Sequence, residues 1–206
     1  MDVLLAAAGL IALSPLFAFV SFQIRRGSRG PVFYRGSRVG RHAWPFRIYK
    51  FRTMVIDAEA RGGSSTADDD PRITPTGAWL RRYKIDELPQ LINVLRGEMS
   101  LVGPRPQVAS DVALYTSEER ELLSVRPGLT DFASVRFRNE GEILRGQPDP
   151  DRAYAELIRP EKIRLGLEYV RTRSLATDCR IIWDTVKAVL GSSDPPSHAS
   201  RLRRPQ

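Results

Sequence analysis

Two adjacent carboxylates, Asp86 and Glu87, are the residues of this sequence best suited to carry out chemistry. An apolar run begins directly after them, and the loop Gly103-Pro104-Arg105-Pro106 follows further along the chain. Neighbouring side chains on a regular helix diverge by about 100°. The two carboxylates therefore do not flank one bond as a glycosidase pair does. Their divergence allows one to attack a substrate while the other holds a metal ion.

Phosphate chemistry suits such a pair, because a carboxylate can attack phosphorus and form an acyl phosphate. Mg²⁺, with one or two carboxylates, and arginines would neutralise the incoming phosphates. The candidate phosphate-binding residues are Arg81, Arg105 and Arg126, with Lys50 and Arg52 as weaker candidates. The competing interpretation is structural: Asp86 only caps a helix, and Glu87 only complements the helix dipole.

A helix from Glu87 to Leu95 is expected to position the carboxylates. Its apolar residues recur at helical spacing, Asp86 is a good N-cap, and Gly97 ends it. A preceding helix is predicted over Thr76–Tyr83, with Trp79 and Leu80 pointing inward.

A small β-hairpin is predicted to supply further basic side chains. Its strands are Val32–Arg35 and Phe46–Met54, joined by a loop over residues 36–40. Because side chains alternate along a strand, Lys50 and Arg52 share one face and could grip one anion together.

The N-terminal segment Val3–Ile24 contains 22 uncharged residues, and as a helix it would reach about 33 Å, enough to cross a bilayer core. Ser14-Pro15 interrupts it, and the Ser14 hydroxyl could satisfy part of the freed backbone. Length favours a kinked helix that spans the membrane. The alternatives are two arms, Val3–Leu13 and Leu16–Ile24, that return to one face, and a buried helix in a soluble core.

Charge orients this segment. The chain carries a formal net charge of +8, and residues 25–52 contain nine basic residues and no acidic one. Such a block beside an apolar segment is typical of the cytoplasmic side, over anionic lipids. Cys179 is the only cysteine, which excludes an intramolecular disulfide and a cysteine-rich zinc site.

We predict an α+β fold that is mostly helical. It comprises an N-terminal membrane helix (1–26), a compact cytosolic catalytic domain (27–191) with the small hairpin and amphipathic interfacial helices, and a disordered tail (192–206). Further helices are predicted over Ser117–Ser124, Pro160–Val170 and Asp178–Leu190.

An ordered set of motifs covering about residues 2–190 resembles the bacterial sugar transferases of the small monotopic phosphoglycosyl transferase type (the PglC-like family). The matching segments are Ser14-Pro15, Gly30-Pro31-Val32-Phe33, Phe46–Met54, Asp70-Pro71-Arg72-Ile73-Thr74, Asp86–Leu91, Asn93–Ser100, Leu101–Pro106 and Arg126–Thr130. No single segment is decisive, but the ordered set is highly specific.

The resemblance implies an enzyme that moves a sugar-1-phosphate from a UDP-sugar to polyprenol phosphate, such as undecaprenyl phosphate, and releases UMP. It implies that Asp86 is the nucleophile, that Glu87 helps to hold Mg²⁺, and that arginines such as Arg138 stabilise the phosphate charge. It also implies that Ser14-Pro15 breaks a re-entrant helix, which reverses the preference for spanning. The enzyme would then be monotopic, on the cytoplasmic face of the bacterial inner membrane.

Three departures from the family pattern stand out. The usual basic flank before the membrane segment is missing, because the chain begins Met1-Asp2. Where the family commonly reads Gly-Trp-Ala-Gln-Val, this chain has Asp131-Phe132-Ala133-Ser134-Val135. The C-terminal tail, residues 192–206, has no counterpart in the family pattern. Separately, larger relatives carry extra N-terminal transmembrane helices, so we expect this chain to be close to the minimal catalytic unit.

A non-enzymatic alternative is a membrane-anchored basic module that binds polyanions. It explains the charge and the apolar anchor but leaves Asp86 and Glu87 without a role, and no nucleic-acid motif supports it. We therefore expect anionic lipids and the two substrates, rather than nucleic acid, as partners. The motifs are compatible with a homodimer and do not specify the sugar.

Overall fold

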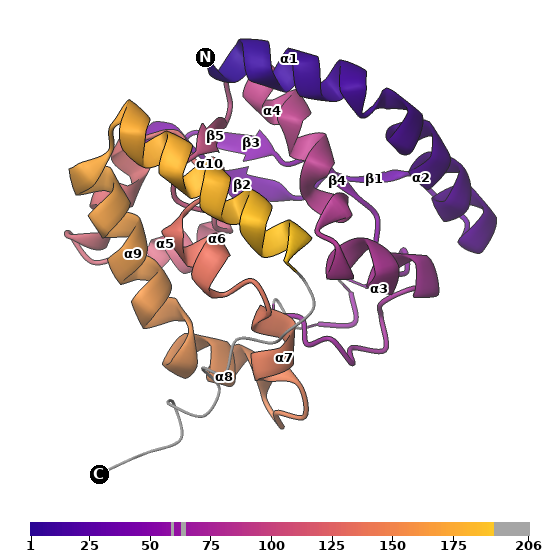
Figure 1. Ribbon diagram of the computed structural model, residues 1–206. Helices are drawn as coiled ribbons and strands as arrows, with labels where there is room; N and C mark the ends of the chain where they lie inside the picture. The colour runs from indigo at the N-terminus through magenta and orange to yellow at the C-terminus, as the bar shows by residue number, and fades with distance from the viewer. Residues whose placement is uncertain (59, 63–64, 192–206) are drawn as a thin grey trace.

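The computed structural model describes residues 1–58, 60–62 and 65–191 (Figure 1). The tail predicted over residues 192–206 lies outside the described residues. The described chain is mostly helical with little β-structure, as predicted, and its strands form three two-stranded pairs within that part of the chain.

The N-terminal apolar segment forms two helices, α1 (Asp2–Ala12) and α2 (Ser14–Gly27), bent by 61° at their junction. Pro15 lies in the first turn of α2, where its missing N–H leaves no bond unmade. The Ser14 hydroxyl donates to the carbonyl of Ile11 at 2.8 Å, as predicted. Within the described residues no single helix has the length and apolar composition to cross a membrane, whereas this bent pair meets both criteria together.

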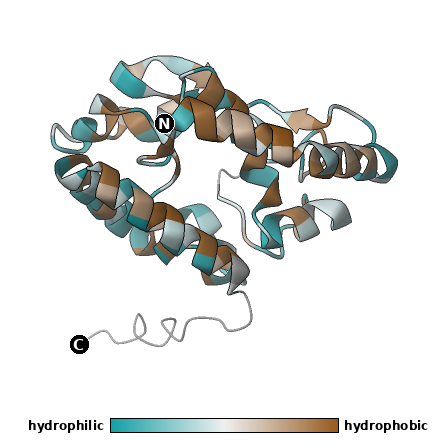
Figure 2. Ribbon diagram, turned by 45° about the horizontal axis from the view of Figure 1, so that its top comes forward, coloured by the Kyte–Doolittle hydropathy of each residue, from teal (hydrophilic) through white to brown (hydrophobic). Residues whose placement is uncertain are grey.

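Both helices bury one side and expose the other. Ala6 of α1 packs with Phe46 and Met99, and α1 lies along α4 (Leu91–Leu95). Val20 of α2 and Leu80 are fully buried in a second cluster, and each such side chain contributes roughly 1.5–3 kcal/mol. The outward side carries exposed large apolar residues: Val3, Leu4, Leu5 and Ile11 on α1, and Phe19 and Phe22 on α2. Figure 2 shows that the ribbon of α1 is largely apolar.

The hairpin turns later in the chain than predicted. Strand β1 (Phe33–Tyr34) pairs with β4 (Lys50–Phe51), and β2 (Ser37–Val39) pairs with β3 (Pro45–Arg47), in one continuous antiparallel register. The prediction that residues 36–40 form the connecting loop is wrong, because residues 37–39 are a strand. The turn lies further on, at η1 (Arg41–Ala43), where His42 and Ala43 adopt positive φ.

The parallel pair β5 (Ser100–Val102) and β6 (Gly128–Thr130) was not predicted. The connection between them carries α5 (Ala109–Ala113) and η3 (Glu119–Ser124). The helix expected over Ser117–Ser124 is therefore a shorter 3-10 helix.

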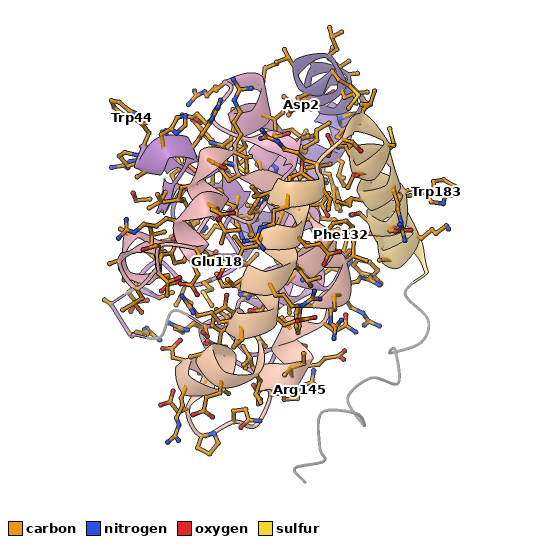
Figure 3. All side chains as sticks on the ribbon, turned by 90° about the vertical axis from the view of Figure 1, so that its left-hand side faces the viewer. Asp2, Trp44, Glu118, Phe132, Arg145 and Trp183 are labelled. Atoms are coloured by element: carbon orange, nitrogen blue, oxygen red, sulfur yellow. The ribbon has the colours of Figure 1, made fainter. Side chains whose placement is uncertain are left out.

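The C-terminal part of the described chain is helical, and α9 and α10 confirm the last two predicted helices. Its elements are α6 (Phe132–Arg136), α7 (Glu140–Leu144), α8 (Pro150–Leu157), α9 (Arg159–Thr172) and α10 (Leu175–Leu190). Helix α10 buries Ile181 against Val102 and Tyr169. Its Trp183 is exposed and points away from the body of the protein, as Figure 3 shows.

Gly103 and Gly128 cross closely at the end of the parallel pair. A Cβ on Gly128 would lie 2.1 Å from the backbone nitrogen of Gly103, and its three nearest neighbours are all backbone atoms of Gly103, which cannot rotate away. We expect Gly128→Ala to lower the free energy of unfolding by about 1–3 kcal/mol. Denaturant unfolding in detergent measures this loss.

Gly27→Ala is the control for that measurement. Its Cβ would meet only the Thr76 hydroxyl at 3.3 Å. We expect a change within about 0.5 kcal/mol, and equal losses for the two variants would contradict the close backbone crossing.

Candidate active site

Asp86 and Glu87 lie in a short 3-10 helix, η2 (Ile85–Gln90), that leads directly into α4. The preceding helix α3 (Pro75–Arg82) ends two residues earlier, and Lys84 turns the chain with a left-handed φ of 57°. The prediction of one α-helix from Glu87 to Leu95 with Asp86 as its N-cap is wrong. Lys84 occupies the cap position, and the Asp86 carboxylate caps nothing. This frees Asp86 from the purely structural role considered above.

The Asp86 carboxylate is buried and unpaired. The residue is 8% exposed, and its Oδ1 has no hydrogen-bond partner among the residues that the structure describes. Burial raises the pKa of Asp86, and the adjacent Glu87 carboxylate raises it further. Lys50, Arg81 and Lys84 oppose this rise without cancelling it.

Glu87 has the opposite environment. The Lys50 ammonium lies 3.0 Å from its Oε1, and the Arg105 guanidinium binds both of its oxygens, with Nη1 2.9 Å from Oε2. Burial alone would raise the pKa of Glu87, but Arg105 and Lys50 hold it well below its usual range. Two neighbouring carboxylates thus differ sharply in proton affinity, a pattern that separates functional roles.

Asn93 on α4 fixes the strand that carries Lys50. Its Oδ1 accepts from the backbone N–H of Tyr49 at 2.9 Å, and its Nδ2 donates to the carbonyl of Arg47 at 2.9 Å. These bonds fall between β3 and β4, where the hairpin pairing is interrupted. The amide therefore satisfies backbone groups that the ladder leaves open and sets the direction of the next residue, Lys50.

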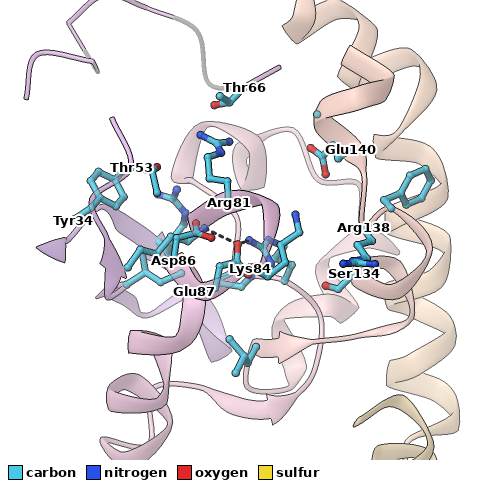
Figure 4. A pocket seen from close by; sticks show the side chains of 18 of the residues that line it. Tyr34, Thr53, Thr66, Arg81, Lys84, Asp86, Glu87, Ser134, Arg138 and Glu140 are labelled. Carbon is cyan, nitrogen blue, oxygen red and sulfur yellow. Dashed lines mark hydrogen bonds and ion pairs between the residues drawn. The ribbon is translucent and has the colours of Figure 1, made fainter. Parts of the chain in front are cut away.

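A cleft of about 1950 Å³ opens in front of the two carboxylates. Lys50, Arg81 and Arg105 line it, and so does Arg138 from the segment after α6. Figure 4 shows Asp86 and Glu87 on one side of this cleft and Arg138 on the other. The cleft is large enough for a nucleotide-sized ligand and is rich in cationic groups, as anionic substrates require.

Three further predictions about site residues are corrected. Arg126 is exposed and does not line the cleft, because it precedes β6 on another side of the molecule. Arg52 lines the cleft with Lys50, but its guanidinium donates to the carbonyls of Ser28 and Arg29 just beyond the end of α2. Trp79 is 40% exposed and is not a core residue.

The sequence reasoning missed several charged residues of the cleft. Lys84 lies beside Asp86, and the pair Glu140–Lys162 lines the wall formed by α7 and α9. A lysine directly before Ile85-Asp86 was a usable signal. Lys162 on a predicted amphipathic helix was not, because such a residue usually faces solvent.

The residues present fit a partial magnesium site. Among the described residues no group of three or more histidine, cysteine, aspartate or glutamate side chains is placed to hold a metal ion. Mg²⁺ commonly needs only one or two carboxylates, with phosphate oxygens and water completing its shell. Glu87 is the carboxylate that could belong to such an incomplete donor set, and Lys50 and Arg105 bind its oxygens in this structure.

The comparison with known sequences agrees with this geometry. The sequence model of the family described as "Bacterial sugar transferase" matches residues 1–192, so the chain belongs to that family.

Individual relatives indicate which kinds of sugar transferase the chain is similar to. The chain is 36% identical over 203 residues to the exopolysaccharide production protein ExoY of Sinorhizobium fredii, covering 91% of this chain and 83% of the relative. It is 37% identical over 193 residues to a UDP-glucose:undecaprenyl-phosphate glucose-1-phosphate transferase of Caulobacter vibrioides, covering 92% and 68%. It is 40% identical over 185 residues to an undecaprenyl-phosphate glucose phosphotransferase of Komagataeibacter xylinus, covering 86% of this chain but only 33% of that longer protein.

Two departures from the family pattern have a structural explanation. Asp2, which stands where a basic flank was expected, accepts a hydrogen bond from the Ser100 hydroxyl at 2.6 Å and so ties the start of α1 to β5. Asp131 caps α6 by accepting from the backbone N–H of Ser134 at 2.6 Å. Phe132 packs edge-on against Tyr169, with ring centroids 6.5 Å apart. These residues stabilise the second wall of the cleft.

The raised pKa of Asp86 predicts a pH-dependent stability effect. The unfolded chain releases this proton near pH 3.8, and the native chain releases it at higher pH. The contribution of Asp86 to the free energy of unfolding is therefore fully present below the ordinary pKa of an aspartate, and it is lost as the pH rises through the raised pKa. We expect Asp86→Asn to remove this loss, so that the variant unfolds at higher temperature than the wild type near neutral pH.

Thermal unfolding of both proteins between about pH 4 and 8 measures the difference. Asp69→Asn, a change at an exposed loop carboxylate, serves as the control. Parallel curves for wild type and Asp86→Asn would show that burial does not perturb this carboxylate.

Proposed function

We propose that this protein is a phosphoglycosyl transferase that moves a sugar-1-phosphate from a UDP-sugar to polyprenol phosphate and releases UMP. The observation that carries the proposal is the buried, unpaired carboxylate of Asp86 beside the doubly paired Glu87, at the wall of a cationic cleft. Family membership and the printed names of the relatives support the same reaction. By the names of those relatives, the acceptor is undecaprenyl phosphate and the pathway is polysaccharide synthesis.

The proposed reaction has two displacement steps. An Asp86 oxygen attacks the β-phosphorus of the UDP-sugar, an acyl-phosphate bond forms, and the bond to the α-phosphate oxygen breaks, so that UMP leaves. An oxygen of polyprenol phosphate then attacks the same phosphorus. The acyl-phosphate bond breaks, which frees Asp86 and releases a polyprenol diphosphate sugar.

The environment of Asp86 suits a nucleophile. No cation or donor among the described residues bonds to Oδ1, so no hydrogen bond to this oxygen has to break before Asp86 attacks. Arg81, Arg138, Lys50 and Arg105 line the cleft and would stabilise the phosphate charge as the bond to UMP breaks.

Mg²⁺ is the proposed cofactor, and Glu87 would help to hold it while Asp86 acts as the nucleophile. The ion would neutralise charge on the diphosphate of the donor. Both Glu87 oxygens are engaged by Arg105 and Lys50, so we infer that one of these cations moves onto the phosphates when the metal is held.

We further propose a monotopic protein on the cytoplasmic face of a bacterial inner membrane. The bend at Ser14-Pro15 would let α1 and α2 enter and leave the same leaflet. The exposed apolar side of the two helices would contact lipid, and Arg25 and Arg26 at the end of α2 would meet anionic headgroups. Asp86 would then lie near the phosphate of the polyprenol.

Asp86→Asn tests the chemical proposal. We expect UMP release to fall by about 10³-fold or more, because a nucleophile is lost and only binding and positioning remain. Intact-protein mass spectrometry of the wild type, mixed with UDP-sugar and Mg²⁺ without acceptor, should show the mass of one phosphosugar.

That adduct should be absent from Asp86→Asn and present in Asp69→Asn. Sustained UMP release by a folded Asp86→Asn protein would refute the role of this carboxylate. Wild-type protein that turns over UDP-sugars without any adduct would refute the covalent step.

Cysteine labelling tests the membrane topology. In a Cys179→Ser background, a cysteine at position 2 and one at the exposed hairpin residue Trp44 should react with an impermeant maleimide only in inverted vesicles. Labelling of position 2 in intact spheroplasts, with position 44 protected, would instead indicate a helix that crosses the membrane.

A further inference from the structure

An ion pair between Glu140 and Lys162 lines the cleft on the wall opposite Asp86. The Lys162 ammonium bonds to Oε2 of Glu140 and lies 5.0 Å from the centre of the Tyr154 ring. The lysine side chain is 13% exposed and the glutamate 29%, so the pair is largely enclosed but accessible from the cleft.

The surrounding structure holds Glu140 firmly in place. It is the first residue of α7, and the next carbonyl, that of Gly141, accepts from the backbone N–H of Asp68 at 3.2 Å. A Cβ at position 141 would overlap the Asp68 carboxylate, so a larger residue there would require this side chain to move. Figure 4 shows Glu140 with Ser134 and Arg138 on the side away from Asp86.

The Glu140–Lys162 pair is linked electrostatically to the reacting carboxylates through Arg105. The pKa of Arg105 is raised mainly by Glu87 and, to a smaller extent, by Glu140. Arg105, which binds Glu87 directly, therefore also senses the charge of the carboxylate on the opposite wall. Tyr154 and Lys162 also sense the charge of Arg105.

We propose that Glu140 and Lys162 form the subsite that binds the sugar hydroxyls of the donor and so selects which UDP-sugar is used. This inference rests on the function proposed above. Oε1 of Glu140 has no partner among the residues that the structure describes, so it can accept from a hydroxyl while Oε2 stays bonded to Lys162. The lysine can donate to a neighbouring hydroxyl oxygen, and together they present an acceptor and a donor side by side.

The position favours the sugar over the other parts of the donor. The sugar is bonded to the phosphorus that Asp86 attacks, whereas the uracil lies beyond a further phosphate and a ribose. A carboxylate repels phosphate groups, which the cations around Asp86 and Glu87 suit better. Sugar hydroxyls are neutral groups that both donate and accept, and a carboxylate–ammonium pair matches them.

The first experiment measures donor selection with the full chain in detergent. UMP release is followed for UDP-glucose, UDP-galactose and UDP-N-acetylglucosamine, with kcat/KM determined for each. We expect Glu140→Gln to change the ratio of kcat/KM between the best donor and its rivals by roughly tenfold or more, because a charged acceptor of a sugar hydroxyl is lost.

Glu119→Gln is the matched control. It also removes an ion pair to α9, with Arg159 at 3.1 Å and comparable burial, but it does not line the cleft. We expect it to leave the donor ratios unchanged. A purely structural role for Glu140 would lower kcat/KM for all donors by one factor, and that result overturns the proposal.

The second experiment measures binding without turnover, in an Asp86→Asn background. Calorimetric titration compares the best UDP-sugar with UDP, which lacks the sugar. Glu140→Gln and Lys162→Met should each weaken the UDP-sugar by roughly tenfold and leave UDP unchanged. Equal weakening of both ligands would assign the pair to the nucleotide and overturn the proposal.

The proposed function and the proposed sugar subsite can be refuted independently of each other. If wild-type protein releases no UMP from any donor, the proposed function fails. If the wild type turns over a UDP-sugar while Glu140→Gln keeps its donor ratios and its UDP-sugar affinity, only the sugar subsite fails.

Discussion

The double pairing of Glu87 with Lys50 and Arg105 is the interaction on which the rest of the site depends. It joins three segments that are distant in sequence: the hairpin strand β4, the 3-10 helix η2 and the loop after β5. Breaking such a buried pair by removing one partner leaves an uncompensated charge, which commonly costs about 3–5 kcal/mol. The pair thus sets the cleft geometry and leaves Asp86 as the unpaired member of the dyad.

The stability of the surrounding core compensates for a locally unfavourable conformation around Asp86. Asp86 is buried without a compensating bond, and Lys84 holds a left-handed φ that side chains rarely adopt. The clusters around Met99 and Leu80 surround this region and hold it in place. Burial disfavours the charged form of this carboxylate. Its reaction with an electrophile removes the charge and so relieves the cost of burying it.

Sequence reasoning located the central dyad and the broken N-terminal helix because both depend on local signals. Adjacent acidic residues, the Ser14-Pro15 break and the spacing in α9 and α10 are visible without tertiary information. The cap position at Lys84, the extra strand residues 37–39 and the partners of Arg52 depend on contacts between distant segments, which no local pattern records. Contacts between distant segments also decide that Arg126 lies outside the cleft and that Glu140 and Lys162 line it.

The anchoring of Arg52 has a mechanical consequence. Its guanidinium holds the carbonyls of Ser28 and Arg29, directly beyond the end of α2, while Lys50, the first residue of β4, lies two residues earlier in the chain. In the membrane topology proposed above, bilayer thickness and curvature would set the tilt of α2. Through the Arg52 contacts, that tilt would then alter the position of the ammonium that contacts Glu87.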